Sequence, residues 1–187
     1  VYLDETDDYN ILKEVLPFAD NQQETTVWEH IERAMVCLQN NLDERGLSLI
    51  NQGDWCDPMN MVGHRGKGVS SWLTMATSWC FQQWSIICQQ CHHNNAADYW
   101  QQLALKLNSD INQHFWRDQW YARGITDLGR TFGTQTDTEG RIFLNPQSWA
   151  MLCGAIDSNK LGSVQQAVES HLMTPYGPEM LSPAYSH

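Results

Sequence analysis

Long apolar runs are absent from this chain of 187 residues. No uninterrupted stretch approaches the roughly 20 apolar residues that a membrane-spanning helix requires, so the sequence predicts no such helix. The first residues, from Val1 to Glu5, also lack the basic and apolar regions of a secretory signal peptide. We therefore expect a soluble, cytoplasmic protein.

Basic residues are scarce, with 11 Lys and Arg against 22 Asp and Glu and a formal net charge of −11. A surface this acidic repels the phosphates of nucleic acids and the headgroups of anionic membranes, so neither is an expected partner. Apolar residues make up 42% of the chain, enough for the core of one domain, whereas the length is short for two. The sequence predicts a single domain over residues 1–187.

The cysteines are even in number, which raises the question of disulfides. Most of them stand among apolar neighbours in helix-like segments, where a thiol behaves as a small hydrophobe, so we expect free thiols. Residues 88–92, Cys-Gln-Gln-Cys-His, match the attachment pattern of c-type haem. This match lies at the end of a long amphipathic stretch, and no second Cys/His pair has the spacing of a zinc site. We expect neither metal nor haem. The six cysteines are Cys37, Cys56, Cys80, Cys88, Cys91 and Cys153.

No segment long enough to indicate a β-strand alternates between apolar and polar residues, whereas the spacing of apolar residues typical of helices recurs along the chain. The pattern predicts helices over about 25–42, 69–90, 96–115, 145–156 and 163–172. Thr25 or Thr26 is a suitable cap for the first, and Pro146 suits the first turn of the fourth, capped by Asn145. The predicted apolar stripe of 69–90 consists of Trp72, Leu73, Ala76, Cys80, Trp84, Ile87 and Cys91.

Two long segments, 47–68 and 115–140, have little periodicity and many glycines. Loops of this length inside a compact domain are uncommon and usually functional, and the second has room for a short hairpin. The fold class that follows is all-α, built from antiparallel helices with long Gly-rich loops. We expect the helices to form the scaffold and the loops to carry the chemistry.

The most informative stretch is 52–63, Gln-Gly-Asp-Trp-Cys-Asp-Pro-Met-Asn-Met-Val-Gly. Asp54 and Asp57 flank Trp55, one of nine tryptophans in the chain. A carboxyl group beside an indole is partly desolvated, which raises its pKa and suits it to donate a proton. Cleavage of a glycosidic bond needs such a donor at the leaving oxygen. From the residues alone, a turn or helix cap explains the two carboxylates equally well.

Several segments together resemble glycoside hydrolase family 94, the inverting disaccharide phosphorylases. Residues 53–63 are similar to the Gly-Asp-Trp-Asn-Asp loop of this family, and with 67–72, Lys-Gly-Val-Ser-Ser-Trp, they resemble most closely its N,N′-diacetylchitobiose phosphorylase branch. Residues 2–9, 27–30, 140–149 and 174–177 agree with the family as well. The resemblance covers essentially the whole chain.

The resemblance implies an (α/α)6-barrel in which Asp57 is the general acid and Trp55 lines the sugar site. Asp54 and Asn60 belong to the same substrate-binding loop, and we expect them to shape it rather than to act. Inorganic phosphate is the implied co-substrate and attacking nucleophile, with no metal or organic cofactor. The implied reaction converts chitobiose and phosphate to N-acetylglucosamine 1-phosphate and N-acetylglucosamine.

Two departures from the family pattern qualify this expectation. Cys56 stands where the family usually has Asn. The chain is also short for twelve barrel helices, and a β-sandwich precedes the barrel in the family. We therefore expect part of a barrel that is incomplete and inactive alone, or alternatively a stand-alone helical binding or assembly module. A partial barrel leaves an apolar face uncovered, which favours a homodimer.

Other charged residues have simpler explanations. His64, Arg65 and Lys67 stand among glycines in a loop that resembles a phosphate cradle only superficially, and a solvated basic loop is the simpler interpretation. Tyr121 and Arg123 lie in the irregular segment 115–140, where they could reach a sugar, but a surface hairpin is expected there.

Overall fold

The computed structural model describes residues 1–19 and 23–186. Its contacts divide the chain into two compact units, Val1–Asn41 and Leu42–His187, and each is described by itself. Helices dominate both, as expected, but short strands accompany them. Within the described residues, no helix is both long and apolar enough to cross a lipid bilayer.

The first unit is built around α2 (Val27–Asn40). Thr26 caps this helix: its Oγ1 accepts a hydrogen bond from the backbone N–H of Glu29 at 3.2 Å, and the Glu29 carboxylate returns one to the Thr26 N–H at 3.1 Å. This reciprocal capping box explains why the predicted start is confirmed. The remaining elements are α1 (Tyr2–Thr6), the 3-10 helix η1 (Tyr9–Lys13), and a hairpin of β1 (Val15–Pro17) and β2 (Glu24–Thr26).

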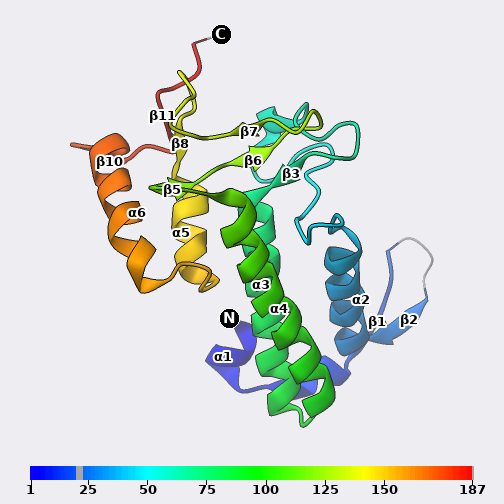
Figure 1. The fold of residues 1–187 in the computed structure, drawn as a ribbon. Helices are drawn as coiled ribbons and strands as arrows, with labels where there is room; N and C mark the ends of the chain where they lie inside the picture. Colours follow the sequence, from blue (N-terminus) through cyan, green and yellow to red (C-terminus); the bar gives the residue numbers. More distant parts are fainter. Residues whose placement is uncertain (20–22, 187) are drawn as a thin grey trace. The chain divides into compact units, whose positions relative to one another are not determined.

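In the second unit, α3 (Ser71–Gln90) and α4 (Asn94–Phe115) form the predicted antiparallel pair (Figure 1). The predicted start of the second helix of the pair, at residue 96, was two residues late, because Asn94 and Asn95 belong to the first turn of α4. The helical period of 96–115 predicts an apolar stripe of Trp100, Leu103, Ala104, Leu107 and Ile111, and all but Leu103 are buried. Buried residues on α4 are Ala97, Trp100, Ala104, Leu107, Ile111 and Phe115.

The predicted apolar stripe of α3 was wrong: of its seven residues only Trp84 is buried. The face that packs is instead rich in small hydroxyl side chains. Ser78 donates to the Ala104 carbonyl at 3.2 Å, and Ser85 donates to the Ala97 carbonyl at 2.7 Å. Small side chains let the two backbones approach closely, and each buried hydroxyl is satisfied by a carbonyl of the facing helix. Hydropathy alone therefore selected the wrong face.

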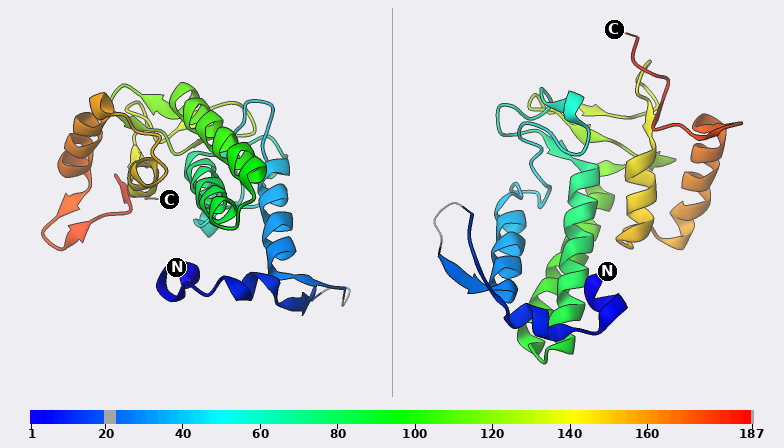
Figure 2. Two further views of the ribbon diagram at one scale, coloured as in Figure 1. Left: turned by 90° about the horizontal axis from the view of Figure 1, so that it is seen from below. Right: turned by 180° about the vertical axis from the view of Figure 1, so that it is seen from behind.

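Two shorter helices follow, α5 (Leu144–Leu152) and α6 (Ser158–His171). Helix α5 packs against α3, and α6 lies on the far side of α5 (Figure 2). Phe143 rather than Asn145 is the N-cap position of α5, and Pro146 lies in the first turn, as predicted. The last helix starts earlier than expected because Asp157 caps it, accepting hydrogen bonds from the backbone N–H groups of Asn159 and Lys160.

Short strands gather at one end of these helices (Figure 1), and their presence corrects the all-α expectation. Most are two residues long, too short to produce an alternating pattern that sequence could show. The hairpin foreseen in 115–140 is confirmed as β4 (Trp116–Arg117) and β5 (Trp120–Tyr121). A three-stranded antiparallel sheet has the strand order β3 (Val69–Ser70), β6 (Gly124–Ile125), β7 (Thr131–Phe132). Two further antiparallel pairs are β8 (Ile142–Phe143) with β11 (Leu181–Ser182), and β9 (Met173–Thr174) with β10 (Gly177–Pro178).

Candidate functional site

The loop 47–68 is closed at its base by its own backbone. Ile50 N–H donates to the Gly68 carbonyl at 2.9 Å, and Ser70 N–H donates to the Ser48 carbonyl at 3.1 Å. A Cβ atom on Gly68 would lie 2.3 Å from the Val62 carbonyl oxygen, closer than atoms can approach. Glycine is thus required where the two sides of the loop pass one another.

Asp54 is anchored inside the loop, and its side chain has no solvent exposure. Arg123 Nη2 lies 2.7 Å from each carboxylate oxygen, and Ser70 Oγ donates to Oδ2 at 2.6 Å. The backbone N–H of Cys56 donates to Oδ1 at 2.9 Å. The carboxylate is fully engaged by the protein, so the geometry gives Asp54 a role in shaping the loop.

Ser70 joins three elements through one hydroxyl group. It donates to Asp54 and accepts from Arg123 Nη1 at 2.9 Å. As the N-cap of α3, it also accepts from the Leu73 N–H at 3.1 Å. A hydroxyl has one donor and two acceptor lone pairs, so its capacity is completely used. We call Asp54, Ser70 and Arg123 the loop clamp.

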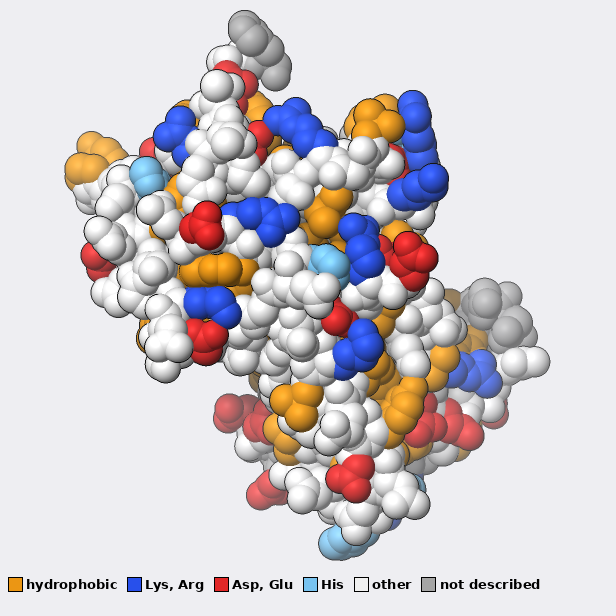
Figure 3. Space-filling view, viewed as in Figure 1, with side chains coloured by type: hydrophobic (Ala, Val, Ile, Leu, Met, Phe, Trp, Pro, Cys, Tyr) orange, Lys and Arg blue, Asp and Glu red, His pale blue; other side chains and the backbone are white. Residues whose placement is uncertain are grey.

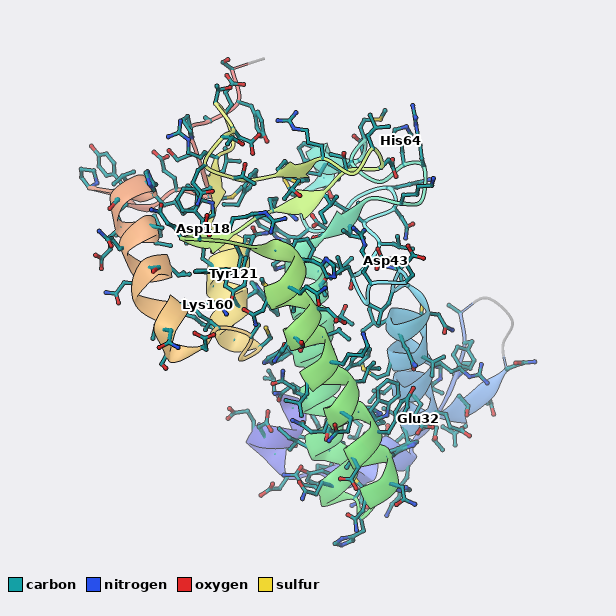
Figure 4. The ribbon with its side chains drawn as sticks, in the orientation of Figure 1. Glu32, Asp43, His64, Asp118, Tyr121 and Lys160 are labelled. Atoms are coloured by element: carbon teal, nitrogen blue, oxygen red, sulfur yellow. The ribbon has the colours of Figure 1, made fainter. Side chains whose placement is uncertain are left out.

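Tyr121 and Arg123 were expected on a surface hairpin, but both are buried, with exposed fractions of 0% and 1%. Figure 4 shows Tyr121 between α4 and α5, where its hydroxyl donates to Asn112 and its N–H to Gln147 Oε1. Burial raises the pKa of the Tyr121 phenol. One feature of the sequence could have indicated this burial: Arg123 is the single charged residue in an otherwise apolar run from Trp120 to Ile125. A charged side chain in such a run is buried only together with a partner of opposite charge.

Asp57 opens the 3-10 turn η2 (Asp57–Met59), with Pro58 as its second residue. Asp57, Trp55 and Asn60 are all exposed, Trp55 by 59%. No ion pair formed by the described residues involves Asp57. Buried Met59, whose N–H donates to the Cys56 carbonyl at 2.9 Å, anchors the turn from below. The loop thus presents one carboxylate and one indole at the surface.

A small cavity of about 130 Å³ lies beside Trp55 and Arg123. The Nε–H of Arg123 is buried and has no hydrogen-bond partner among the described residues. The Arg123 guanidinium lies 5.9 Å from the centre of the Phe143 ring, a further cavity residue. The other lining residues are Cys56, Leu144, Asn145, Ser148, Met180 and Leu181.

A larger cavity of about 700 Å³ also reaches Cys56 and is mostly apolar. Its charged residues include Arg130 and Asp137, which form an ion pair at 2.6 Å. Burial acts to raise the pKa of Asp137, but hydrogen bonds from Thr134 and Arg130 outweigh it and hold the pKa below the usual value. Arg130 is therefore occupied by a partner within the chain.

The basic loop around His64 encloses a carboxylate of the protein itself. Backbone N–H groups of Arg65, Lys67 and Gly68 each donate to Asp127 at 2.9 Å, and His64 Nδ1 lies 3.4 Å from it. Desolvation acts to raise the pKa of Asp127, and these backbone bonds lower it overall. His64 stands at the outer end of the loop in Figure 4, and Lys and Arg side chains gather over this end of the unit in Figure 3. The N–H cradle is occupied by Asp127.

All six cysteines are free, which confirms that expectation. Burial raises the pKa of Cys153 to about 11 and that of Cys56 above its usual value, so both thiols are neutral near pH 7. Among the described residues, no three His, Cys, Asp or Glu side chains are grouped as a metal site would need.

Comparison with known proteins gives consistent results. A cellobionic acid phosphorylase of Neurospora crassa is 48% identical over 99% of the chain, and an N,N′-diacetylchitobiose phosphorylase of Vibrio proteolyticus is 27% identical over 99%. The chain spans 23% of the length of each. The crystal structure of a GH78 family rhamnosidase of Bacillus sp. GL1 shares the fold, with a TM-score of 0.62 at 16% identity, over 82% of this chain and 15% of that one.

The model of the glycosyl hydrolase 94 superfamily, catalytic domain, matches residues 1–187. It includes the loop that presents Asp57 and the clamp that holds this loop. The chain therefore belongs to the glycosyl hydrolase 94 superfamily, to its catalytic domain.

Proposed function

We propose that this chain supplies the general acid of an inverting disaccharide phosphorylase, and that the acid is Asp57. The observation that carries the proposal is the contrast between the two carboxylates of the loop. Asp54 is buried and held by Arg123 and Ser70, whereas Asp57 is exposed three residues later. Only Asp57 is free to approach a substrate oxygen. The exposed indole of Trp55 offers an apolar surface beside it for a sugar ring.

One carboxylic acid is sufficient for the proposed reaction. Asp57 transfers its proton to the glycosidic oxygen as the bond from that oxygen to the anomeric carbon breaks. A phosphate oxygen attacks the anomeric carbon from the opposite face and forms the new bond. The products are a sugar 1-phosphate of inverted configuration and a free sugar. Phosphate is itself a good nucleophile, so no second carboxylate is needed to activate water.

The substrate proposal rests on the family relatives. The relative at 48% identity is named for cellobionic acid and the one at 27% for N,N′-diacetylchitobiose. Higher identity favours a cellobionic-type disaccharide as the first substrate to test. Chitobiose, favoured by the motif of residues 53–72, is the second. In either case inorganic phosphate is the co-substrate.

We further propose that the 187 residues do not complete this reaction alone, with phosphate bound by residues outside them. Two observations support this proposal. The chain spans only 23% of the length of each phosphorylase compared above. The backbone N–H groups around His64 that could bind phosphate are already bonded to Asp127. If the chain acts by itself, it would do so as a helical binding or assembly module without catalysis.

Phosphorus NMR tests both proposals. The 187-residue chain and the longer polypeptide that this proposal requires are each incubated with phosphate and with cellobionic acid or diacetylchitobiose. We expect a sugar 1-phosphate signal only from the longer protein. Asp57→Asn should lower its formation by at least about 100-fold, since general acid catalysis contributes 10²–10⁴-fold.

The matched control is Asp118→Asn, an exposed carboxylate on the β4–β5 hairpin at φ +57°, where Asn is well tolerated. It should leave the rate unchanged. An Asp57→Asn protein as active as Asp118→Asn would disprove the assignment of the acid. A signal from the 187-residue chain would disprove its incompleteness.

A further inference from the structure

We propose that Arg123 and Ser70 are positioning residues for the proposed acid: through Asp54, the loop clamp sets the place of Asp57. The inference rests on the proposed function and adds two buried residues, Ser70 at 0% and Arg123 at 1% exposure. The clamp joins the acid loop to the start of α3 and to the residue that precedes β6 through five hydrogen bonds of 2.6–3.1 Å.

The connection from the clamp to Asp57 is short and made of backbone. Asp54 Oδ1 accepts from the Cys56 N–H at 2.9 Å, and the Cys56 carbonyl accepts from the Met59 N–H at 2.9 Å. The second of these bonds closes the 3-10 turn in which Asp57 is the first residue. A shift of the Asp54 carboxylate therefore moves the peptide that leads directly into Asp57.

Ser70 and Arg123, the two residues that hold Asp54, are themselves fixed by the surrounding structure. Ser70 caps a helix of 20 residues, and Arg123 is fixed at its backbone by the Phe132 carbonyl and by Ser71, whose N–H and Oγ both donate to the Arg123 carbonyl. Gly133, at φ +79°, lies so close that a Cβ there would be 2.6 Å from Arg123 N. These contacts fix the backbone of Arg123, and its buried guanidinium is held in turn by Ser70 and Asp54.

Asp57 itself has little to hold it. It is exposed and takes part in no ion pair among the residues that the structure describes. Its position is set by the backbone of the loop, in which the N–H of the preceding residue, Cys56, is held by Asp54. Misplacement of a reacting group by about 1 Å can cost about 100-fold in rate.

The test uses two donors with the longer polypeptide that the proposed function requires. One is the natural disaccharide, whose leaving sugar must be protonated. The other is a dinitrophenyl glycoside of the same donor sugar, whose phenolate leaves without a proton. A misplaced acid slows the first reaction and spares the second, whereas general damage to the fold slows both.

The variants are Ser70→Ala, which removes the bridging hydroxyl, and Arg123→Lys, which keeps the charge but loses the fork of donors. For each, we expect kcat for the disaccharide to fall about 10–100-fold with little change in KM, and the rate with the dinitrophenyl glycoside to fall less than about 3-fold. Ser70→Thr, which keeps a hydroxyl, should recover most of the loss. Lys106→Gln, in an exposed pair on α4, is the control and should change neither rate.

Ser70→Ala is the primary variant, because Arg123→Lys, fully buried, disturbs folding more. Two results would overturn the positioning role of the clamp and leave the assignment of Asp57 intact. One is an equal loss of rate with both donors. The other is full disaccharide activity in Ser70→Ala when Asp57→Asn is inactive. Full disaccharide activity in Asp57→Asn would overturn the proposed acid and the clamp with it.

Discussion

At the scale of single residues, the decisive feature is the difference between two aspartates three positions apart. Asp54 and Arg123 both have fully buried side chains and form an ion pair with complete hydrogen bonding of the carboxylate. Removing one member of such a pair leaves an uncompensated buried charge, which costs far more than an exposed pair can contribute.

Asp54→Asn should therefore destabilise the chain by about 3–5 kcal/mol, because Arg123 is left buried without its counter-ion. The measurement is the free energy of unfolding in urea at neutral pH. Lys106→Gln, which removes an exposed ion pair with Asp110 on α4, should cost less than about 0.5 kcal/mol. Similar losses in both variants would show that the Asp54–Arg123 pair is not the anchor described above.

Asp127 predicts a pH dependence of stability. Its folded-state pKa lies below the ordinary value of 3.8, because three backbone N–H groups stabilise the carboxylate against the opposing effect of desolvation. A depressed pKa gives stability that is complete above the unfolded pKa and is lost as the pH falls through the folded one. Urea unfolding of the native chain and of Asp127→Asn, from about pH 6 down to about pH 2, measures it.

We expect the native chain to be more stable than Asp127→Asn at the upper end of this range and the difference to shrink below the ordinary Asp pKa. The charge interaction with His64, 3.4 Å away, also lowers the pKa of Asp127. A difference that stays constant down to the lowest pH would contradict the role of the carboxylate.

At the scale of elements, the contact between α3 and α4 shows how small side chains determine packing. Ala104 is completely buried on α4, and its carbonyl accepts from Ser78 of α3. Protein interiors are close-packed, so extra atoms at such a contact force the helices apart.

Ala104→Leu should therefore cost about 1–3 kcal/mol, although Leu is a strong helix former. Gln102→Leu, on the exposed face of the same helix, introduces the same side chain without a neighbour to displace and should change stability little. Calorimetric melting of the two variants makes the comparison. If Ala104→Leu melts at or above the temperature of Gln102→Leu, the contact is looser than the geometry indicates.

At the scale of the whole molecule, much of the predicted apolar stripe of α3 remains uncovered. Trp72, Leu73 and Ile87 are only half-buried, and Ile86 is 47% exposed. Neighbouring helices expose further large side chains, including Met151 and Leu152 on α5. Exposed apolar area of this kind favours association in water.

We therefore expect the isolated 187-residue chain to form a homodimer through these faces. Sedimentation equilibrium at micromolar concentration measures the mass. Ile86→Lys together with Leu152→Lys should weaken the association, because each places a charge on the apolar face. Glu169→Lys, on the polar face of α6, makes a matched control for added charge. A well-folded monomer at these concentrations would exclude the dimer.

Residue type and spacing predicted the main helices, their order and the two long loops, and the resemblance of several segments to known motifs indicated the family. Helical periodicity and capping are local properties, so 27–40, 71–90 and 94–115 were predictable, as was the loop with Asp57 and Trp55. The sequence did not predict three features: the two-residue strands, the polar packing face of α3 and the burial of Arg123. The Ser78–Ala104 contact joins residues 26 positions apart and the Arg123–Asp54 pair joins residues 69 positions apart, and contacts at such separations exist only once the chain has folded. The strands are too short to show an alternating pattern. Tertiary structure alone decided which of the two aspartates is buried as a structural anchor and which is left exposed.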